Sequence, residues 1–216
     1  MLLGLAGLGL LAAGIGPAHA AALDSLEQFI RQTRSGRAAF TQVVTPPARD
    51  GQAARARTST GRFEFQRPGR FRFTYERPFP QVIVADGATL WLHDIDLNQV
   101  TARPQASALG STPAALIASA PDLKSLQADF ALQAQPDRDG MQWVSATPRS
   151  REGALQSIRV GLRAGDKGVE LGALEIVDSF GQRSVLSFSR FEVNPSLGPE
   201  VFQFRPPPGA DVVQSK

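Results

Sequence analysis

Apolar and polar residues alternate with a period of two along most of this chain after residue 36. Such alternation is typical of strands that bury one face. In residues 61–66 two phenylalanines alternate with polar side chains, and in residues 70–76 three aromatic side chains do the same. Pro68 and Gly69 stand between the two runs and indicate a turn. The pattern therefore predicts a hairpin with one aromatic face.

The same pattern predicts about eleven short strands with the spacing of antiparallel meanders rather than of β-α-β units. We expect them at residues 40–44, 61–66, 70–76, 81–85, 89–94, 97–103, 128–134, 141–147, 155–163, 169–178 and 183–192. Neither an internal repeat nor a domain linker interrupts the series. The sequence predicts one mainly β domain with short helices.

Three short helices are expected around these strands. Leu23, Leu26 and Ile30 have helical spacing, and Asp24 or Ser25 can cap a helix there. Residues 112–118 begin with a capping threonine and a proline at the first helical position, followed by helix formers. Residues 121–126 predict a further short helical turn. A helical insertion thus breaks the sheet once, and another helix precedes it.

The first 22 residues carry no charge and are rich in leucine, alanine and glycine. Residues 17–20 read Pro-Ala-His-Ala, with small residues at the positions that a signal peptidase reads. We predict a signal peptide over residues 1–20, with cleavage as late as residue 22, and a single domain over 21–216. A retained membrane anchor and a buried core helix are the alternatives, disfavoured by the small-residue end and by the glycines.

Composition narrows the classes of function. The chain has 216 residues, 42% hydrophobic and 20% charged, with a net charge of +3 that is spread along it. No basic run with interleaved aromatic residues indicates nucleic acid as a partner. Cysteine is absent, so the domain has no disulfide to hold it and cannot be a lipoprotein acylated on cysteine.

Candidate catalytic groups are few. After the predicted leader the chain has one histidine, His93, and no Gly-x-Ser-x-Gly motif accompanies it. A transition-metal site at His93, Asp94 and Asp96 is disfavoured because no second histidine is available. Asp94, Asp96 and Asn98 are better explained as a turn. We therefore expect no enzyme, no metal and no cofactor.

Arg67 is the exception to the aromatic face. If strand alternation continues past Phe65, Arg67 points to the same side as Phe63 and Phe65, where a guanidinium is costly unless it finds acceptors. The free carbonyl groups at the end of the predicted helix at 112–118 would serve. Arg67 would then hold a helical cover over an apolar face. The alternative is a turn residue in solvent before Pro68.

At these residues the chain resembles the LolA family of periplasmic outer-membrane lipoprotein carriers. The resemblance covers nearly the whole chain after the leader, and its strength lies in the order and spacing of the matches. The matching stretches are Phe40-Thr41-Gln42, Arg67-Pro68-Gly69-Arg70-Phe71-Arg72-Phe73, Val84-Ala85-Asp86-Gly87 with Leu90-Trp91, residues 94–100, Thr112-Pro113 with Leu116-Ile117-Ala118, and Phe202-Gln203-Phe204-Arg205-Pro206-Pro207-Pro208-Gly209.

The resemblance implies an unclosed antiparallel β-barrel whose apolar cavity is covered by a helical lid, with Arg67 as the latch of that lid. It implies a periplasmic, monomeric chaperone that accepts acylated lipoproteins from the LolCDE transporter of the inner membrane and delivers them to the receptor LolB. The side chains expected to line the cavity are Phe63, Phe65, Phe71, Phe73, Tyr75, Trp91, Leu116 and Ile117.

Two other functions stay open on the residues alone. A general periplasmic lipid- or glycolipid-binding protein would have the same architecture and a different ligand. A periplasmic enzyme would need His93 with Asp94 and Asp96, whereas a carrier would tolerate their replacement. The identity of the bound ligand separates the first alternative from a lipoprotein carrier.

Overall fold

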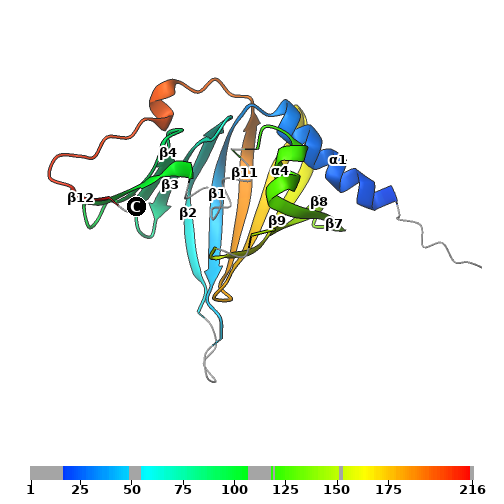
Figure 1. The fold of residues 1–216 in the computed structure, drawn as a ribbon, viewed down its shortest axis with the longest axis horizontal. Coiled ribbons are helices and arrows are strands. Elements are labelled where there is room, and N and C mark those ends of the chain that lie inside the picture. Colours follow the sequence, from blue (N-terminus) through cyan, green and yellow to red (C-terminus); the bar gives the residue numbers. More distant parts are fainter. Residues whose placement is uncertain (1–16, 49–54, 107–117, 119, 151–152, 215–216) are drawn as a thin grey trace, which may run out of the picture.

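The computed structural model describes residues 17–48, 55–106, 118, 120–150 and 153–214, with the backbone alone for residues 17–20. In this part of the chain twelve strands form one sheet (Figure 1), in the order β12-β6-β5-β4-β3-β2-β1-β11-β10-β9-β8-β7. The two edge strands, β12 and β7, do not pair with each other, so the sheet is unclosed. The prediction of a mainly β, unclosed fold is confirmed.

Most of the described elements are strands, and only a few are helices. The elements are α1 (Pro17–Gln32), β1 (Ser35–Thr45), β2 (Arg57–Gln66), β3 (Arg70–Arg77), β4 (Gln81–Ala85), β5 (Thr89–Asp94), β6 (Gln99–Pro104), α4 (Leu123–Asp129), β7 (Phe130–Arg138), β8 (Met141–Pro148), β9 (Leu155–Gly165), β10 (Gly168–Asp178), β11 (Arg183–Val193), the 3-10 helix η1 (Pro199–Phe202) and β12 (Asp211–Gln214).

All eleven predicted strands are present, with bounds that differ by a few residues. The twelfth, β12, was not predicted, and it is parallel to its neighbour β6, whereas the other pairs are antiparallel. α1 begins at Pro17, well before the expected cap at Asp24 or Ser25. The helical turn expected at 121–126 is α4, capped by Asp122. Of the helix expected at 112–118, only Ala118, which is helical, lies within the described residues.

The aromatic hairpin forms as the alternation predicts. In the β2–β3 register Phe63 lies opposite Phe73 and Phe65 lies opposite Phe71, so these side chains share one face of the sheet. We call this face the inner face. α1 packs on the β7–β10 part of it, and Leu26, Phe29 and Ile30 of the helix are each at most 2% exposed.

The opposite, outer face of β4–β6 is also apolar. Val82, Val84, Val100 and Ala102 are buried there. The chain after β11 provides their cover: η1 contacts β3, and β12 adds itself to the edge at β6. Phe202 of η1 is 1% exposed. The sheet is therefore apolar on both faces at β4 and β5, and the C-terminal segment, which returns to this side of the sheet in Figure 1, lies over the outer face.

Candidate functional site

Five of the predicted cavity side chains lie together on the inner face. Phe63, Phe65, Phe71 and Phe73 are between 0% and 7% exposed, and Tyr75 is partly buried against the same cluster. The rings of Phe63 and Phe73 stack with centroids 4.4 Å apart, and those of Phe63 and Phe65 lie 5.6 Å apart. Such ring pairs stabilise each other beyond their buried area. The hairpin thus provides a continuous aromatic surface.

Four further aromatic residues extend this surface, and the sequence reasoning did not assign them to it. Phe40 of β1 meets Tyr75 edge to face at 5.0 Å, and Phe188 of β11 lies 5.6 Å from Phe63. Phe29 of α1 and Phe191 of β11 lie 6.1 Å apart and both contact Phe65. The available signal was strand parity, which would place Phe40 and Phe188 on a common face once β1 and β11 were known to pair.

Tyr75 lies at the far end of the aromatic surface from Arg67. Burial raises the pKa of its phenol to about 12, because removing the phenolate from water is unfavourable. Ile83 of β4 and Leu90 of β5 continue the apolar surface as partly buried side chains. The inner face is therefore apolar from α1 across to β5.

Trp91 lies on the other face. The register opposes it to Val84 and Ala102, and its ring lies 5.5 Å from Phe204 of the C-terminal segment. Its indole N–H donates to Asp86 at 2.9 Å. Burial works to raise the pKa of Asp86, but the hydrogen bonds from the Thr89 N–H, the Trp91 indole and the Ala88 N–H together lower it. The structure does not bring Trp91 together with the inner-face aromatic residues.

Two other predicted site residues, Leu116 and Ile117, lie outside the described part of the chain. His93 follows Trp91 on the outer face, with its ring 5.7 Å from Phe204. Its Nε2 is buried and has no hydrogen-bond partner among the described residues. Asp94 accepts a hydrogen bond from the Leu97 N–H and so shapes the β5–β6 turn.

Arg67, which directly follows β2, is buried and joins the end of α1 to Ala120. It is 9% exposed. Its Nε donates to the carbonyl oxygen of Thr33, just after α1, at 2.9 Å, and its Nη1 donates to the carbonyl oxygen of Ala120 at 3.0 Å. Helix C-terminal carbonyl groups carry partial negative charge and suit a cation. Arg67 is thus not a solvent-exposed turn residue, and it links α1 to the chain around Ala120.

The environment of the guanidinium is apolar apart from these carbonyl groups. It lies 5.5 Å from the centre of the Phe65 ring and 5.6 Å from that of Phe29, a cation–π geometry. Burial, with the charge of Arg34, lowers the pKa of Arg67 to about 10, so the side chain is charged at neutral pH. Its Nη2 is buried without a hydrogen-bond partner among the described residues.

A second link joins the same segment to the β2–β3 turn. The Gly69 N–H donates to the Ala118 carbonyl oxygen at 2.7 Å. Gln105, 3% exposed, donates to the Gly69 carbonyl oxygen at 2.6 Å and accepts from the Gly87 N–H at 2.8 Å. Gly69 has φ +70°, a backbone conformation that favours glycine. Gln105 thus links the β2–β3 turn to the β4–β5 turn at Gly87, and the β2–β3 turn is bonded to Ala118. We call Ala118 and Ala120 the cover segment.

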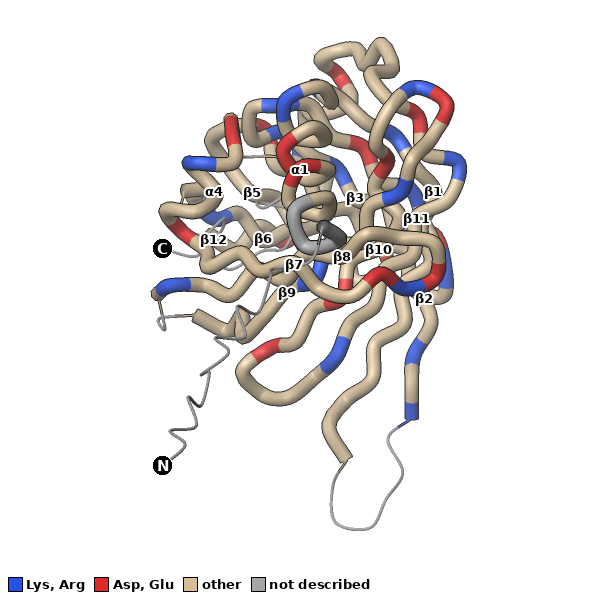
Figure 2. The backbone as a smooth tube through the Cα atoms, turned by 90° about the vertical axis from the view of Figure 1, so that its right-hand side faces the viewer, with Lys and Arg blue, Asp and Glu red and all other residues tan. Residues whose placement is uncertain are grey.

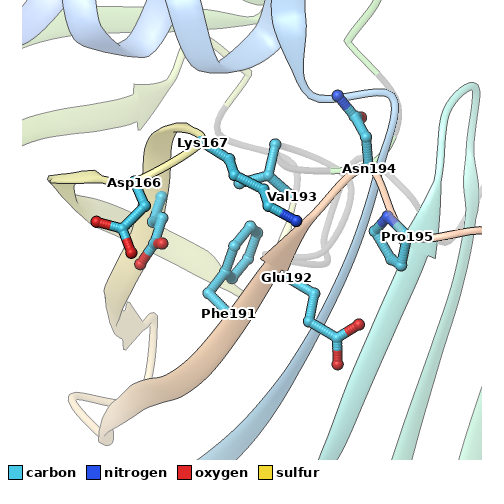
Figure 3. A pocket seen from close by; sticks show the side chains of 8 residues that line it. Asp166, Lys167, Phe191, Glu192, Val193, Asn194 and Pro195 are labelled. Atoms are coloured by element: carbon cyan, nitrogen blue, oxygen red, sulfur yellow. The ribbon is translucent and has the colours of Figure 1, made fainter.

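A pocket of about 250 Å³ opens near the end of β11 (Figure 3). Its lining includes four charged residues: Asp166, Lys167, Glu170 and Glu192. Phe191, whose ring packs on Phe29 and Phe65, also borders it. So many charges make this pocket unsuitable for an acyl chain, and the candidate ligand-binding surface is the aromatic inner face.

An open, curved sheet with an aromatic inner face is typical of the class of proteins that bind apolar ligands. Among the described residues, no helix is both long enough and apolar enough to span a membrane. These residues also include no group of three or more histidine, cysteine or acidic side chains placed to hold a metal ion.

The chain belongs to the LolA family: the family model described as "Outer membrane lipoprotein carrier protein LolA" matches residues 31–205. An outer-membrane lipoprotein carrier protein of Albidiferax ferrireducens is 65% identical over 204 residues, which are 94% of this chain and 96% of that protein. A protein of the same name from Methylibium petroleiphilum is 54% identical over 198 residues, 92% of each chain. The family resemblance stated from the sequence is confirmed.

Among solved structures, a DUF1329 family protein from Desulfovibrio piger has the same fold, with a TM-score of 0.52 at 10% identity over 86% of this chain and 97% of that one. An uncharacterized conserved protein from Thermus thermophilus also has a TM-score of 0.52, at 12% identity over 91% of this chain and 98% of that one. At these identities the likeness concerns the fold alone.

Proposed function

We propose that this chain is a non-enzymatic periplasmic carrier that takes acylated lipoproteins from the inner-membrane transporter LolCDE and delivers them to the outer-membrane receptor LolB. Its membership of the LolA family carries the proposal, together with relatives named outer-membrane lipoprotein carrier proteins at up to 65% identity. The carrier acts as a monomer after removal of residues 1–20, with cleavage as late as residue 22. The acyl chains of the cargo lie against the inner face.

The aromatic composition of the inner face suits this ligand. Rings and aliphatic chains attract each other without directional hydrogen bonds, so many acyl chains can be accepted. Phe63, Phe65, Phe71, Phe73 and Tyr75 are the proposed contact residues, and Leu116 and Ile117 are proposed to meet the ligand from the cover. Trp91 is not included because it faces the C-terminal segment.

A carrier must also release its cargo. Three acyl chains of about fifteen methylenes each would yield roughly 36 kcal/mol if fully buried, at about 0.8 kcal/mol per methylene. Non-covalent affinities reach only about 18–21 kcal/mol. The carrier therefore uses partial burial, and the closed cover competes with cargo for the inner face. No cofactor or nucleotide is needed in the carrier, since the transporter supplies the energy.

Arg67 is the proposed latch of the empty state. Its hydrogen bond to Ala120 holds the cover segment closed and breaks when cargo enters, while its hydrogen bond to Thr33 keeps the side chain anchored beside α1. A leucine at this position cannot form these hydrogen bonds. The closed, empty state then loses stability relative to the open, cargo-bound state. Arg67→Leu is thus expected to fold and to bind cargo but to release it slowly.

The experiment is a transfer assay with purified components. The processed chain is incubated with membranes that carry an acylated lipoprotein, and the soluble complex is isolated; an unacylated form of the same lipoprotein is the control. We expect a complex with the acylated form only, and passage of the cargo to LolB. Mass spectrometry of the bound material identifies the ligand. A complex with phospholipid or glycolipid, and none with lipoprotein, would refute the lipoprotein proposal.

The latch is tested in the same assay. Arg67→Leu is compared with Arg62→Leu, which removes an arginine from the same strand where the side chain is 64% exposed and pairs with Glu76. We expect slow release only for the Arg67 variant. Arg67→Lys keeps the charge but lacks the planar fork, and it should give an intermediate rate. Release by Arg67→Leu at the wild-type rate would contradict the latch.

A further inference from the structure

Three arginines converge on one buried carboxylate on the outer face, away from the aromatic surface. Glu175 of β10 has a side chain that is only 7% exposed. Arg138 of β7, Arg159 of β9 and Arg183 of β11 approach its carboxylate oxygens at 2.5 Å, 3.5 Å and 3.2 Å. We call these four residues the Glu175 cluster. β7 to β10 lie toward the viewer in Figure 2.

Arg138 is held in place by two contacts. Its guanidinium lies 4.4 Å from the centre of the Trp143 ring and donates a hydrogen bond to Glu175. Trp143 is 3% exposed, its indole N–H donates to the Arg138 carbonyl oxygen, and its ring lies over Gly161, where a Cβ would already be 3.0 Å away. The arginine therefore rests on a fixed platform rather than moving freely in solvent.

The charges of the cluster do not balance. Three guanidinium groups face one carboxylate, and Asp139, 3.4 Å from Arg138, adds one more negative charge at an exposed position. The arginine side chains are 46%, 51% and 54% exposed. Each guanidinium has five N–H donors, so donors remain for a further acceptor. A single arginine would suffice to pair Glu175, and the repulsion among three guanidiniums favours a second anion.

The residues around the Glu175 cluster indicate which kind of molecule supplies that anionic group. Phe180 stands in the turn three residues before Arg183 and is 78% exposed. Arginine and aromatic side chains together are typical of the energetically important part of protein interfaces. An anionic membrane would respond to net charge, which is only +1 when Asp139 is counted, and would attract this surface weakly. A carboxylate on a protein pairs with each guanidinium fork directly.

We propose that the Glu175 cluster, with Phe180 beside it, is a docking surface for an acidic segment of a partner protein. Arg159 and Arg183 are the residues that pair with the partner's carboxylates, while Arg138 keeps Glu175 neutralised. The surface lies on the opposite face of the sheet from the cargo-binding residues. A partner can therefore hold the carrier here while cargo occupies the inner face, and the proposal does not depend on the identity of the cargo.

Trp143 provides a reporter for the test. The chain has two tryptophans, so a Trp91→Phe background leaves Trp143 as the single indole, stacked under Arg138. In that background the full processed chain is titrated with an octaglutamate peptide, and Trp143 fluorescence is recorded. We expect a saturable change that weakens as salt is added, and no change with octalysine.

Paired variants separate the cluster from net charge. Arg159→Gln with Arg183→Gln leaves the Arg138–Glu175 hydrogen bond in place, so the buried carboxylate stays paired and the fold is preserved, as circular dichroism checks. Arg37→Gln with Arg62→Gln removes the same charge from the outer face of β1 and β2, where each arginine pairs with a glutamate. We expect octaglutamate affinity to fall at least about tenfold in the first pair and to change little in the second.

The outcomes that overturn the proposal are distinct. Equal loss of affinity in both pairs would show that only net charge matters. Absence of an octaglutamate response would show that the cluster does not dock acidic segments. Binding to vesicles of equal parts phosphatidylglycerol and phosphatidylcholine, lost in the Arg159/Arg183 pair and without peptide binding, would assign the surface to a membrane instead. An equal response to inorganic phosphate would reduce it to a small-anion site.

Discussion

The inner face has two covers, and they are attached by different forces. α1 lies on β7–β10 through Leu26, Phe29 and Ile30, all at most 2% exposed. The cover segment contributes alanine side chains, and its described links to the hairpin are the hydrogen bonds from Arg67 to Ala120 and from Gly69 to Ala118. Within the described residues, α1 is attached by large apolar side chains, and the cover segment by these hydrogen bonds and two buried alanines.

Because of this difference, we expect the cover segment to open more easily than α1. Burial of a large apolar side chain stabilises by about 1.5–3 kcal/mol, so removing α1 from the sheet would cost several times that amount. A hydrogen bond contributes only about 0.5–1.5 kcal/mol net, and one from a charged donor about 1.5–3 kcal/mol. Breaking the described hydrogen bonds of the cover segment therefore costs a few kcal/mol, while lifting α1 amounts to unfolding. Arg67 contacts both, and we expect it to keep its hydrogen bond to Thr33 when the cover segment opens.

Phe29→Ala should have the largest effect on this comparison. Phe29 packs against Phe65, Phe191 and the Arg67 guanidinium, and truncating such a ring costs about 3–5 kcal/mol. We expect the free energy of unfolding to fall by that amount in urea titrations. Phe79→Ala, at a side chain that is 71% exposed, is the control and should stay within about 0.5 kcal/mol. A loss for Phe29→Ala as small as the control's would contradict permanent attachment of α1.

Gly36→Ala should have the next largest effect. A Cβ on Gly36 would meet the rings of Phe65 and Phe191, which lie under α1 and cannot shift without disturbing Phe29. Overpacking of this kind costs about 1–3 kcal/mol. Gly153→Ala is the matched control, because the nearest atom to its added Cβ is 4.0 Å away. Thermal denaturation should separate the two variants; equal melting temperatures would mean that the aromatic cluster is loosely packed.

These two expectations depend on tertiary packing that the sequence reveals only in part. The alternation of apolar and polar residues was sufficient to predict the β2–β3 hairpin, because a two-residue turn between two periodic runs determines which side chains share a face. It failed for β12: Asp211–Gln214 is exposed on every residue, so no period marks it as a strand. α1 was predicted too short because a capping residue at Asp24 or Ser25 competes with helix formers on both sides.

The candidate site, like the fold, could be predicted from the sequence only in part. Strand parity led to the inner-face aromatic residues and to a buried Arg67, but the acceptor at Thr33 depends on where α1 ends in space. Trp91 could not be assigned from its own strand, since Leu90 and Leu92 alternate with Trp91 and His93 and both faces read as apolar. The reason is the C-terminal segment, whose Phe204 covers the outer face. A cover contributed from the far end of the chain leaves no local signal.

Arg67→Leu should change global stability little. The variant loses two hydrogen bonds but also removes a buried charge whose Nη2 has no hydrogen-bond partner among the described residues, and the two effects oppose each other. We expect a change of at most about 1 kcal/mol in the free energy of unfolding, with Arg62→Leu as control. A loss of about 3–5 kcal/mol, as for a broken buried ion pair, would show that Arg67 holds the whole fold together rather than the cover segment.

The smallest expected effect is on the titration of Tyr75, which reports directly whether its phenol is buried. It is the single tyrosine of the chain, so an ultraviolet absorbance titration reports its phenol alone. We expect a midpoint near pH 12. Because the pKa is raised by folding, its stabilising contribution is complete below about pH 10 and is lost as the pH rises to about 12. A midpoint near pH 10 in the folded protein would place Tyr75 in solvent.

Native-state hydrogen exchange tests the two-cover account most directly. The Gly69 amide donates to the cover segment at Ala118, whereas the amides of Phe29 and Ile30 lie within α1. We predict that the Gly69 amide of the empty protein exchanges by local opening, at least about tenfold faster than the α1 amides and with little dependence on denaturant. Exchange of all three at the rate of global unfolding would contradict the account, because the cover would then open only when α1 does.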